Sequence, residues 1–205
     1  SGTPTKKKLP NNREIKSLSE VAKSFDGGST PKKSEDSFWE SGSISWATTS
    51  DYPNRGKYTE SVDETITENA IDSTSSKVVD TNTLFVTIIA TIGEVAIPSK
   101  PMAVNQQTVA ITPNDSVNLK YLYQIINFYQ PLLEEKARGG AYKAINQSHL
   151  KSLEIPVPPL EKQDIIVNKI ESLDFDKIDR SSEILTSLFS EYRDSVLSHA
   201  FQGKY

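Results

Sequence analysis

Three prolines between residues 156 and 159 divide this chain into two parts. Each proline lacks a backbone donor, fixes its own φ and disfavours the helical conformation in the residue before it. Residues 154–160 are therefore predicted to be extended. We expect a compact unit over residues 1–157 and a long helix over residues 158–205.

Composition limits the class of protein. The chain has 205 residues, of which 36% are hydrophobic and 24% charged, enough for one substantial core and an appendage. No apolar run approaches the roughly 20 residues of a membrane span, and the lysine-rich residues 1–10 lack the apolar core of a signal peptide. The absence of cysteine excludes disulfides and thiolate sites and fits a reducing compartment. We therefore expect a soluble, cytoplasmic protein.

The charge balance bears on possible nucleic-acid binding. A net charge of −4 argues against a protein that binds nucleic acid without regard to sequence, because such proteins carry a general basic excess. The charges are nevertheless unevenly distributed, since residues 1–33 hold eight Lys/Arg and three Asp/Glu whereas residues 60–72 hold five acids and no base. A basic face is compatible with this pattern.

The order of predicted elements favours an α+β fold. Short β-branched or alternating runs predict strands, and one of them, at residues 15–22, is either a strand or a strand and a turn. The other predicted strands cover residues 44–48, 84–89, 94–97 and 107–112. A short helix is predicted at residues 65–71, and helical spacing of apolar residues predicts another from Leu119 to Tyr129, ended by Pro131. Strands that come first and helices that follow argue against a doubly wound fold.

Motifs of the common nucleotide-binding and hydrolase folds are missing. The chain has no glycine-rich phosphate loop and no serine on a strand-to-helix turn. His149 and His199 lie in different parts of the chain, and for each a structural or capping role is the preferred interpretation. Catalysis by this chain is therefore not expected.

One alternative of the enzyme class remains. Asp115, Glu134 and Lys136 superficially match the Asp…Glu-x-Lys pattern of metal-dependent nucleases, whose two carboxylates share one Mg²⁺. The apolar spacing around Glu134 and Lys136 is helical, however, and a salt-bridged helix surface explains the same residues. We predict no metal site.

Several segments together resemble one known family. They read GGSTP at residues 27–31, ATIGEVAI at 90–97, MAVNQ at 102–106, IPVPPLEKQ at 155–163 and AFQGK at 200–204. In this order they resemble the DNA-specificity subunits of Type I restriction-modification enzymes. Members of that family commonly contain two target-recognition domains and two conserved helices, whereas this chain has one of each. It therefore resembles half a subunit, either a natural one that pairs with a second copy or a fragment of a longer protein.

The resemblance implies a function without catalysis. A target-recognition domain would read part of a bipartite site in double-stranded DNA and direct separate methyltransferase subunits to it, and through them a restriction subunit. S-adenosylmethionine, Mg²⁺ and ATP would bind those partners, so no cofactor is expected here. A coiled-coil adaptor that binds only protein is the second alternative. The target sequence and the spacer length cannot be derived from the sequence.

Candidate DNA contacts follow from the chemistry of base recognition, which needs hydrogen-bonding side chains on loops held by a rigid core. Residues suited to base edges are Thr48, Thr49, Ser50, Asn105, Gln106 and Gln107. Cations suited to phosphates are Lys32, Lys33, Arg55, Lys57, Lys77, Arg138 and Lys143.

The C-terminal helix carries an apolar stripe with coiled-coil spacing. The stripe consists of Ile166, Ile170, Leu173, Leu185, Phe189, Tyr192 and Val196, and its phase shifts between residues 174 and 180. About 40 helical residues would span roughly 60 Å. By resemblance, two copies would pair these helices antiparallel, giving a homodimer with a recognition domain at each end.

Overall fold

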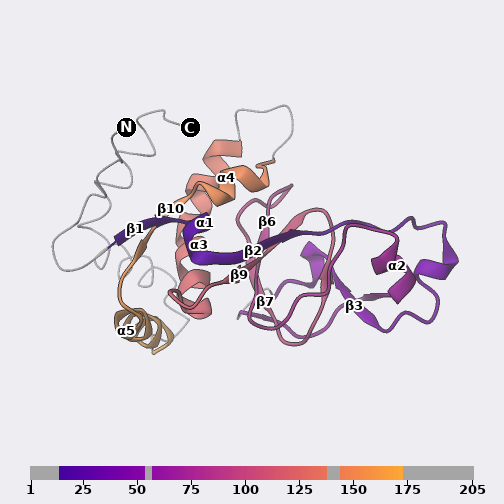
Figure 1. The fold of residues 1–205 in the computed structure, drawn as a ribbon, viewed down its shortest axis with the longest axis horizontal. Coiled ribbons are helices and arrows are strands. Elements are labelled where there is room, and N and C mark those ends of the chain that lie inside the picture. Colours follow the sequence, from indigo (N-terminus) through magenta and orange to yellow (C-terminus); the bar gives the residue numbers. More distant parts are fainter. Residues whose placement is uncertain (1–13, 54–56, 138–143, 173–205) are drawn as a thin grey trace.

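A five-stranded sheet lies at the centre of the computed structural model, which describes residues 14–53, 57–137 and 144–172 (Figure 1). Its strand order is β2-β9-β6-β7-β4. The strands are β2 (Ala22–Gly27), β9 (Thr108–Pro113), β6 (Leu84–Thr87), β7 (Val95–Pro98) and β4 (Tyr58–Thr59). The predicted strands at residues 84–89, 94–97 and 107–112 are thereby confirmed to within two residues. The α+β fold is confirmed as well.

A three-stranded sheet, β5-β3-β8, forms a smaller lobe. It contains β3 (Ile44–Ala47), β5 (Glu64–Ile66) and β8 (Ala103–Val104), with the 3-10 turns η1 (Asp36–Phe38) and η2 (Thr49–Asp51) and the helix α2 (Glu68–Asp72). A core of its own surrounds Trp46, Ile66 and Ala70. Figure 1 shows this lobe at one end of the long axis, with α5 at the other.

The prediction of a helix at residues 65–71 is wrong for residues 65–67. Thr65 and Ile66 belong to β5, which pairs antiparallel with β3. Thr67 then caps α2, because its hydroxyl accepts a hydrogen bond from the Ala70 amide at 3.3 Å. The β-branched residues thus extend the sheet, and the helix starts only where the threonine cap permits it.

The third sheet has two strands. It pairs β1 (Glu14–Ser17) with β10 (Glu154–Val157), and the short helices α1 (Leu18–Val21) and α4 (Gln147–Lys151) lie beside it in the chain. The predicted extended conformation of residues 154–160 is confirmed up to Pro159, after which α5 (Leu160–Glu171) begins. The prolines therefore end a strand and introduce a helix, as the sequence indicates.

Helix α3 (Leu119–Ala137) continues past Pro131, so the predicted end at this proline is wrong. Leu133 and Ala137 are buried and extend the apolar face of Leu122, Ile126 and Tyr129 beyond the proline. Pro131 itself is exposed. Burial of the next turn therefore outweighs the backbone hydrogen bond that the proline removes. None of the described helices is long and apolar enough to cross a bilayer.

Helix α5 packs against α3 rather than projecting from the rest of the structure. Ile166, Val167 and Ile170 are buried in the same core as α3 and the central sheet. Ile166 and Ile170, predicted above to belong to the stripe that pairs with a second copy, are instead covered by α3 and its neighbours within this chain. The remaining stripe residues, Leu173, Leu185, Phe189, Tyr192 and Val196, lie outside the described residues.

Candidate nucleic-acid interface

Four polar segments meet where the three-stranded sheet joins the five-stranded sheet. They are residues 27–30, 48–51, 76–77 and 105–107. Strands β3 and β8 are parallel and in register at Ala47 and Val104, so the chain leaves both strands at the same edge. Thr48 and Asn105 therefore begin neighbouring loops, and the Asn105 amide donates to the Ala47 carbonyl at 3.1 Å. The topology thus unites candidate base-reading segments that are 57 residues apart in the sequence.

The turn at residues 105–107 is held by Asn105. Its Oδ1 accepts from the Gln107 amide at 3.0 Å, and its Nδ2 donates to Gln107 Oε1 at 3.1 Å. This Asx turn occupies the side chain, and Asn105 is only 6% exposed. Gln106, at the tip, is exposed, and its Oε1 accepts a hydrogen bond from Thr30. Of the predicted amides, Gln106 is presented at the surface and Asn105 shapes the loop behind it.

Residues 28–30 form a strap across this turn. A Cβ on Gly28 would lie 2.2 Å from the Asn105 carbonyl oxygen, so only glycine lets the two backbones approach this closely. The Ser29 amide donates to Ser76 Oγ at 3.0 Å, and the indole Nε1 of Trp46 donates to the Ser29 carbonyl at 3.2 Å. The strap is therefore fixed to both neighbouring segments. It braces Gln106 through Thr30.

Lys77 supplies positive charge beside the strap. Its Nζ lies 2.6 Å from Asp26 Oδ1, and its side chain remains 69% exposed whereas that of Asp26 is largely buried. Burial alone would raise the pKa of the Asp26 carboxyl, but hydrogen bonds from Lys77 and Ser24 and the charge of Lys77 outweigh it and lower the pKa. Asp26 thus stays ionised and orients the lysine. An exposed ammonium of this kind can contact a phosphate.

The turn at residues 48–51 is shaped by an aspartate that the sequence prediction missed. Asp51 Oδ2 accepts from the Thr48 amide at 2.7 Å and from the Thr48 hydroxyl at 2.9 Å, and its Oδ1 accepts from the Asp63 amide at 3.1 Å. Thr48 and Asp51 therefore close a capping box. The spacing Thr-x-x-Asp was the signal that could have revealed it. Ser50, between them, is exposed and its hydroxyl bonds to that of Thr48 at 2.6 Å.

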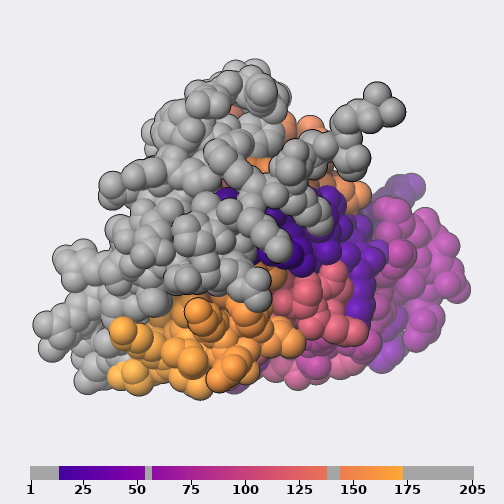
Figure 2. Space-filling view, turned by 60° about the vertical axis from the view of Figure 1, so that its left-hand side comes forward, coloured from indigo at the N-terminus to yellow at the C-terminus, as the bar shows by residue number. Residues whose placement is uncertain are grey.

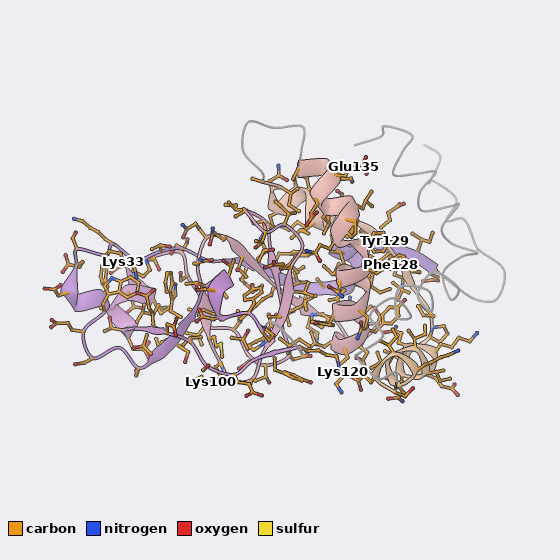
Figure 3. All side chains as sticks on the ribbon, turned by 180° about the vertical axis from the view of Figure 1, so that it is seen from behind. Lys33, Lys100, Lys120, Phe128, Tyr129 and Glu135 are labelled. Atoms are coloured by element: carbon orange, nitrogen blue, oxygen red, sulfur yellow. The ribbon has the colours of Figure 1, made fainter. Side chains whose placement is uncertain are left out.

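Other predicted phosphate contacts lie elsewhere. Lys33 is in the small lobe, with its Nζ 3.5 Å from the Trp39 ring centroid and ion-paired with Glu64 (Figure 3). Lys32, its neighbour, is exposed in the same lobe. The Lys57 side chain is only 13% exposed and is ion-paired with Glu171 of α5, so it faces the helix. Arg55, Arg138 and Lys143 lie outside the described residues.

Comparison with known proteins identifies the family. The model of the Type I restriction modification DNA specificity domain matches residues 10–188. The chain belongs to this family. Its curated relatives include the EcoR124I/EcoR124II specificity subunit of Escherichia coli, 30% identical over 197 residues that cover 90% of this chain and 48% of the relative. The MjaIX specificity subunit of Methanocaldococcus jannaschii is 30% identical over 189 residues, covering 90% and 43% of the two chains.

Solved structures support the same fold for this specificity domain. The HsdS subunit from Thermoanaerobacter tengcongensis aligns with a TM-score of 0.61 at 20% identity, covering 99% of this chain and 48% of its own. The S subunit from M. genitalium aligns with a TM-score of 0.55 at 22% identity, covering 95% and 50%. The specificity domain thus spans about half the length of the relatives it matches.

The geometry of this specificity domain does not favour the nuclease alternative. Asp115 lies in the loop before α3 and is ion-paired with Lys23 at 2.7 Å. Glu134 and Lys136 lie in the last turns of α3, an axial rise of about 22 Å beyond its first residue. Figure 3 marks the two ends of this helix at Lys120 and Glu135. Within the described residues no three His, Asp or Glu side chains gather in a way that could hold a metal ion.

The structural interpretation of His149 is confirmed. The residue is the third of α4, and its Nδ1 accepts from the Asn146 amide at 3.3 Å while its own amide donates to Asn146 Oδ1 at 2.9 Å. The pair forms a capping box. His199 lies outside the described residues.

Proposed function

We propose that this chain reads one part of a DNA target for a Type I restriction-modification system, without carrying out catalysis itself. The observation that carries the proposal is the family match over residues 10–188, and the convergence of the polar segments around Gln106 supports it. The chain would direct separate methyltransferase subunits, and through them a restriction subunit, to double-stranded DNA in the cytoplasm. S-adenosylmethionine, Mg²⁺ and ATP would be bound by those partners.

Gln106 and Lys77 would have different roles at the interface: Gln106 would contact a base and Lys77 a phosphate. A glutamine amide offers a donor and an acceptor together, a pattern that suits the major-groove edge of adenine. Thr30 and the Asn105 turn hold this side chain in a defined position before DNA arrives. The Lys77 ammonium offers only donors, so it cannot match the donor and acceptor pattern of adenine as glutamine does, and it suits the phosphate backbone. The strap between them, residues 28–30, keeps the two groups in a fixed relation.

A second recognition unit would complete the target. Because the chain spans about half of its relatives, we propose that it works with another copy of itself, or with a second half of a longer protein. Two identical units related by a two-fold axis read half-sites that are inverted repeats. The division into a recognition domain, residues 1–157, and a C-terminal helix, residues 158–205, is part of this proposal.

Selection of binding sites from random DNA by the chain in complex with its methyltransferase subunits tests the function. Gln106→Ala should relax preference at one base pair, by roughly 1 to 3 kcal/mol. Lys77→Ala should weaken binding to every sequence and reduce the salt slope by about 1. Lys100→Ala, at an exposed position outside the four segments, is the matched control.

Three other outcomes would point away from the proposal. Equal affinity for every duplex at moderate salt would contradict the proposal that the chain recognises a sequence. Cleavage of DNA in the presence of Mn²⁺ that disappears in Glu134→Ala would favour the alternative that the chain is a metal-dependent nuclease. Stable binding of the protein partners with no DNA binding at all would favour the adaptor.

A further inference from the structure

Gln163 uses its whole side-chain amide in hydrogen bonds where α5 meets the rest of the domain. It is fully buried, and its Nε2 donates to the Ser116 carbonyl at 2.9 Å and to the Pro158 carbonyl at 2.8 Å. Its Oε1 accepts from the Asn118 amide at 2.8 Å. Both amide protons and the carbonyl are therefore used. Hydrogen bonds have preferred angles, so this side chain fixes the rotation of α5 as well as its distance.

Asn118 connects this contact to the start of α3. Its Oδ1 accepts from the Lys120 amide at 2.8 Å and from the Tyr121 amide at 3.3 Å, which caps the helix. Its Nδ2 donates to Asp164 of α5 at 2.8 Å. One residue thus caps α3 and holds α5. The N-terminal ends of the two helices are joined by directional bonds on both sides of Asn118.

Glu171 provides a second point of attachment at the other end of α5. Its carboxylate is ion-paired with Lys57, which precedes β4, and its Oε1 lies 3.5 Å from Nζ of Lys120 in α3. The Lys57 hydrogen bond, against the effect of burial, lowers the pKa of the Glu171 carboxyl, so the group is ionised at neutral pH. Figure 3 shows Lys120 at the end of α3 that lies beside α5.

The two attachment points lie eight residues apart, an axial distance of about 12 Å along α5. Two separated points fix the direction of a rod, whereas one point leaves it free to pivot. The buried Ile166, Val167 and Ile170 lie between them and supply apolar contact. Apolar contact is non-directional and tolerates small rotations, so the polar groups at the ends define the angle. The outer face of α5 remains at the molecular surface (Figure 2).

We propose that Gln163, Asn118 and Glu171, with Lys57 and Lys120, form a polar clasp that fixes the direction in which the chain leaves the recognition domain after α5. The clasp would thereby set the distance and the relative rotation between this domain and the second recognition unit. Its residues are positioning residues that touch no base. This inference rests on the proposed function for its effect on DNA, and on the structure alone for its effect on the angle of α5.

The angle can be measured without DNA, because the chain contains no cysteine and accepts two spin labels at chosen sites. Labels at Lys100→Cys and Lys169→Cys, both exposed, report on the central domain and on α5. Figure 3 shows Lys100 away from the α5 end. The sample is diluted with unlabelled chain so that only distances within one chain contribute. The unsubstituted background should give one narrow distance distribution.

Variants of the clasp should broaden this distribution. Glu171→Gln removes the ionic end and Gln163→Met removes the hydrogen-bonded end, and the pair together should at least double the width. Asp115→Asn is the matched control, since it removes a surface ion pair with Lys23 that does not involve α5. Glu171→Gln alone serves if the buried Gln163 substitution impairs folding. An unchanged narrow distribution in every clasp variant that folds, or in Glu171→Gln alone if only that variant folds, would overturn the clasp.

The consequence for DNA is measured with the complex and bipartite duplexes whose spacer is varied by one and two base pairs. The unsubstituted protein should prefer one spacer at least tenfold, and Glu171→Gln with Gln163→Met should reduce that preference below threefold while keeping the base preference of each half-site. A retained spacer preference would overturn the clasp and leave the proposed function intact. If the unsubstituted protein showed no base preference, the proposed function would be refuted instead. The distances between the spin labels would still test whether the clasp fixes α5.

Discussion

Gly28 lies against the peptide carbonyl of Asn105, so closely that a side chain has no place between them. A Cβ there would come within 2.0 Å of the Val104 oxygen and 2.2 Å of the Asn105 oxygen. Gly27, the preceding residue, would have nothing within 4 Å of an added Cβ. Adjacent glycines in the GGSTP segment therefore have different roles. Gly28 is needed for the approach of two backbones at the candidate interface.

Substitution of Gly28 by alanine should therefore destabilise the domain by roughly 1 to 3 kcal/mol, because the strap or the Asn105 turn must shift to make room. The shift would also move Thr30 and Gln106, so sequence preference should fall more than affinity for random DNA. Chemical denaturation and binding-site selection measure the two effects. Gly27→Ala is the control and should change either quantity little. Equal effects of the two substitutions would contradict the role given to Gly28.

Acidification should weaken the ionic end of α5. The pKa of Glu171 is lowered in the folded protein, mainly by Lys57, below the unfolded value of about 4.3. A lowered folded-state pKa contributes stability above the unfolded value, and that stability is lost as the pH falls through the folded value. The unfolding free energy of Glu171→Gln should therefore lie roughly 1 to 2 kcal/mol below that of the unsubstituted protein at pH 7.

This difference should shrink as the pH falls below about 4. Urea denaturation at several pH values from 7 down to 3 measures it. Glu161→Gln, at an exposed position on the same helix, serves as the surface control and should have little effect at neutral pH. A difference that stays constant over the whole range would mean that the carboxylate of Glu171 contributes by packing and not by its charge.

Local sequence signals predicted β3, β6, β7, β9 and the extended proline segment, because these depend on neighbouring residues. The strand predicted at residues 15–22 is wrong in part, since α1 occupies Leu18–Val21. Residues 84–87 are buried on both faces, and a β-branched run with polar flanks indicates this directly. Long-range contacts were not predictable in the same way. Lys57 was assigned to phosphate from its local setting, but its partner Glu171 lies 114 residues further along the chain. Ile166 and Ile170 were likewise assigned to a second copy because their burial by α3 depends on the tertiary fold.

Pro131 illustrates the competition between local and tertiary terms. The rule that proline ends a helix failed because Leu133 and Ala137 gain burial in the core only if α3 continues. The helix therefore accepts the lost hydrogen bond to the carbonyl of Asn127. Pattern reasoning would have found this by extending the apolar spacing of Leu122, Ile126 and Tyr129 one turn further.

Pro131→Ala should accordingly stabilise the domain, by roughly 1 to 3 kcal/mol, since it restores that hydrogen bond at an exposed position. Part of the gain is offset because alanine leaves the unfolded chain more freedom than proline does. Thermal unfolding measures the net change. Pro101→Ala, at an exposed loop position, has no helical bond to restore and should be neutral or slightly destabilising. A lower melting temperature for Pro131→Ala would mean that α3 depends on the proline ring for packing.

The two parts of the C-terminal apolar stripe should respond differently to charge. Ile170 is 3% exposed and packs in the core of its own domain. Ile170→Asp should therefore destabilise the recognition domain by at least about 3 kcal/mol, because an ionised carboxylate would be buried there without a partner. Leu185 and Phe189 lie outside the described residues, on the segment predicted to pair with a second copy.

The double substitution Leu185→Glu with Phe189→Glu should abolish pairing without lowering the stability of the recognition domain. Light scattering at tens of micromolar measures the mass, and thermal unfolding measures the domain. The unsubstituted chain should have the mass of a dimer, the double variant that of a monomer, and both should share one domain melting temperature. A monomeric mass for the unsubstituted chain, unchanged by the substitutions, would exclude the homodimer. The second recognition unit would then belong to a longer chain.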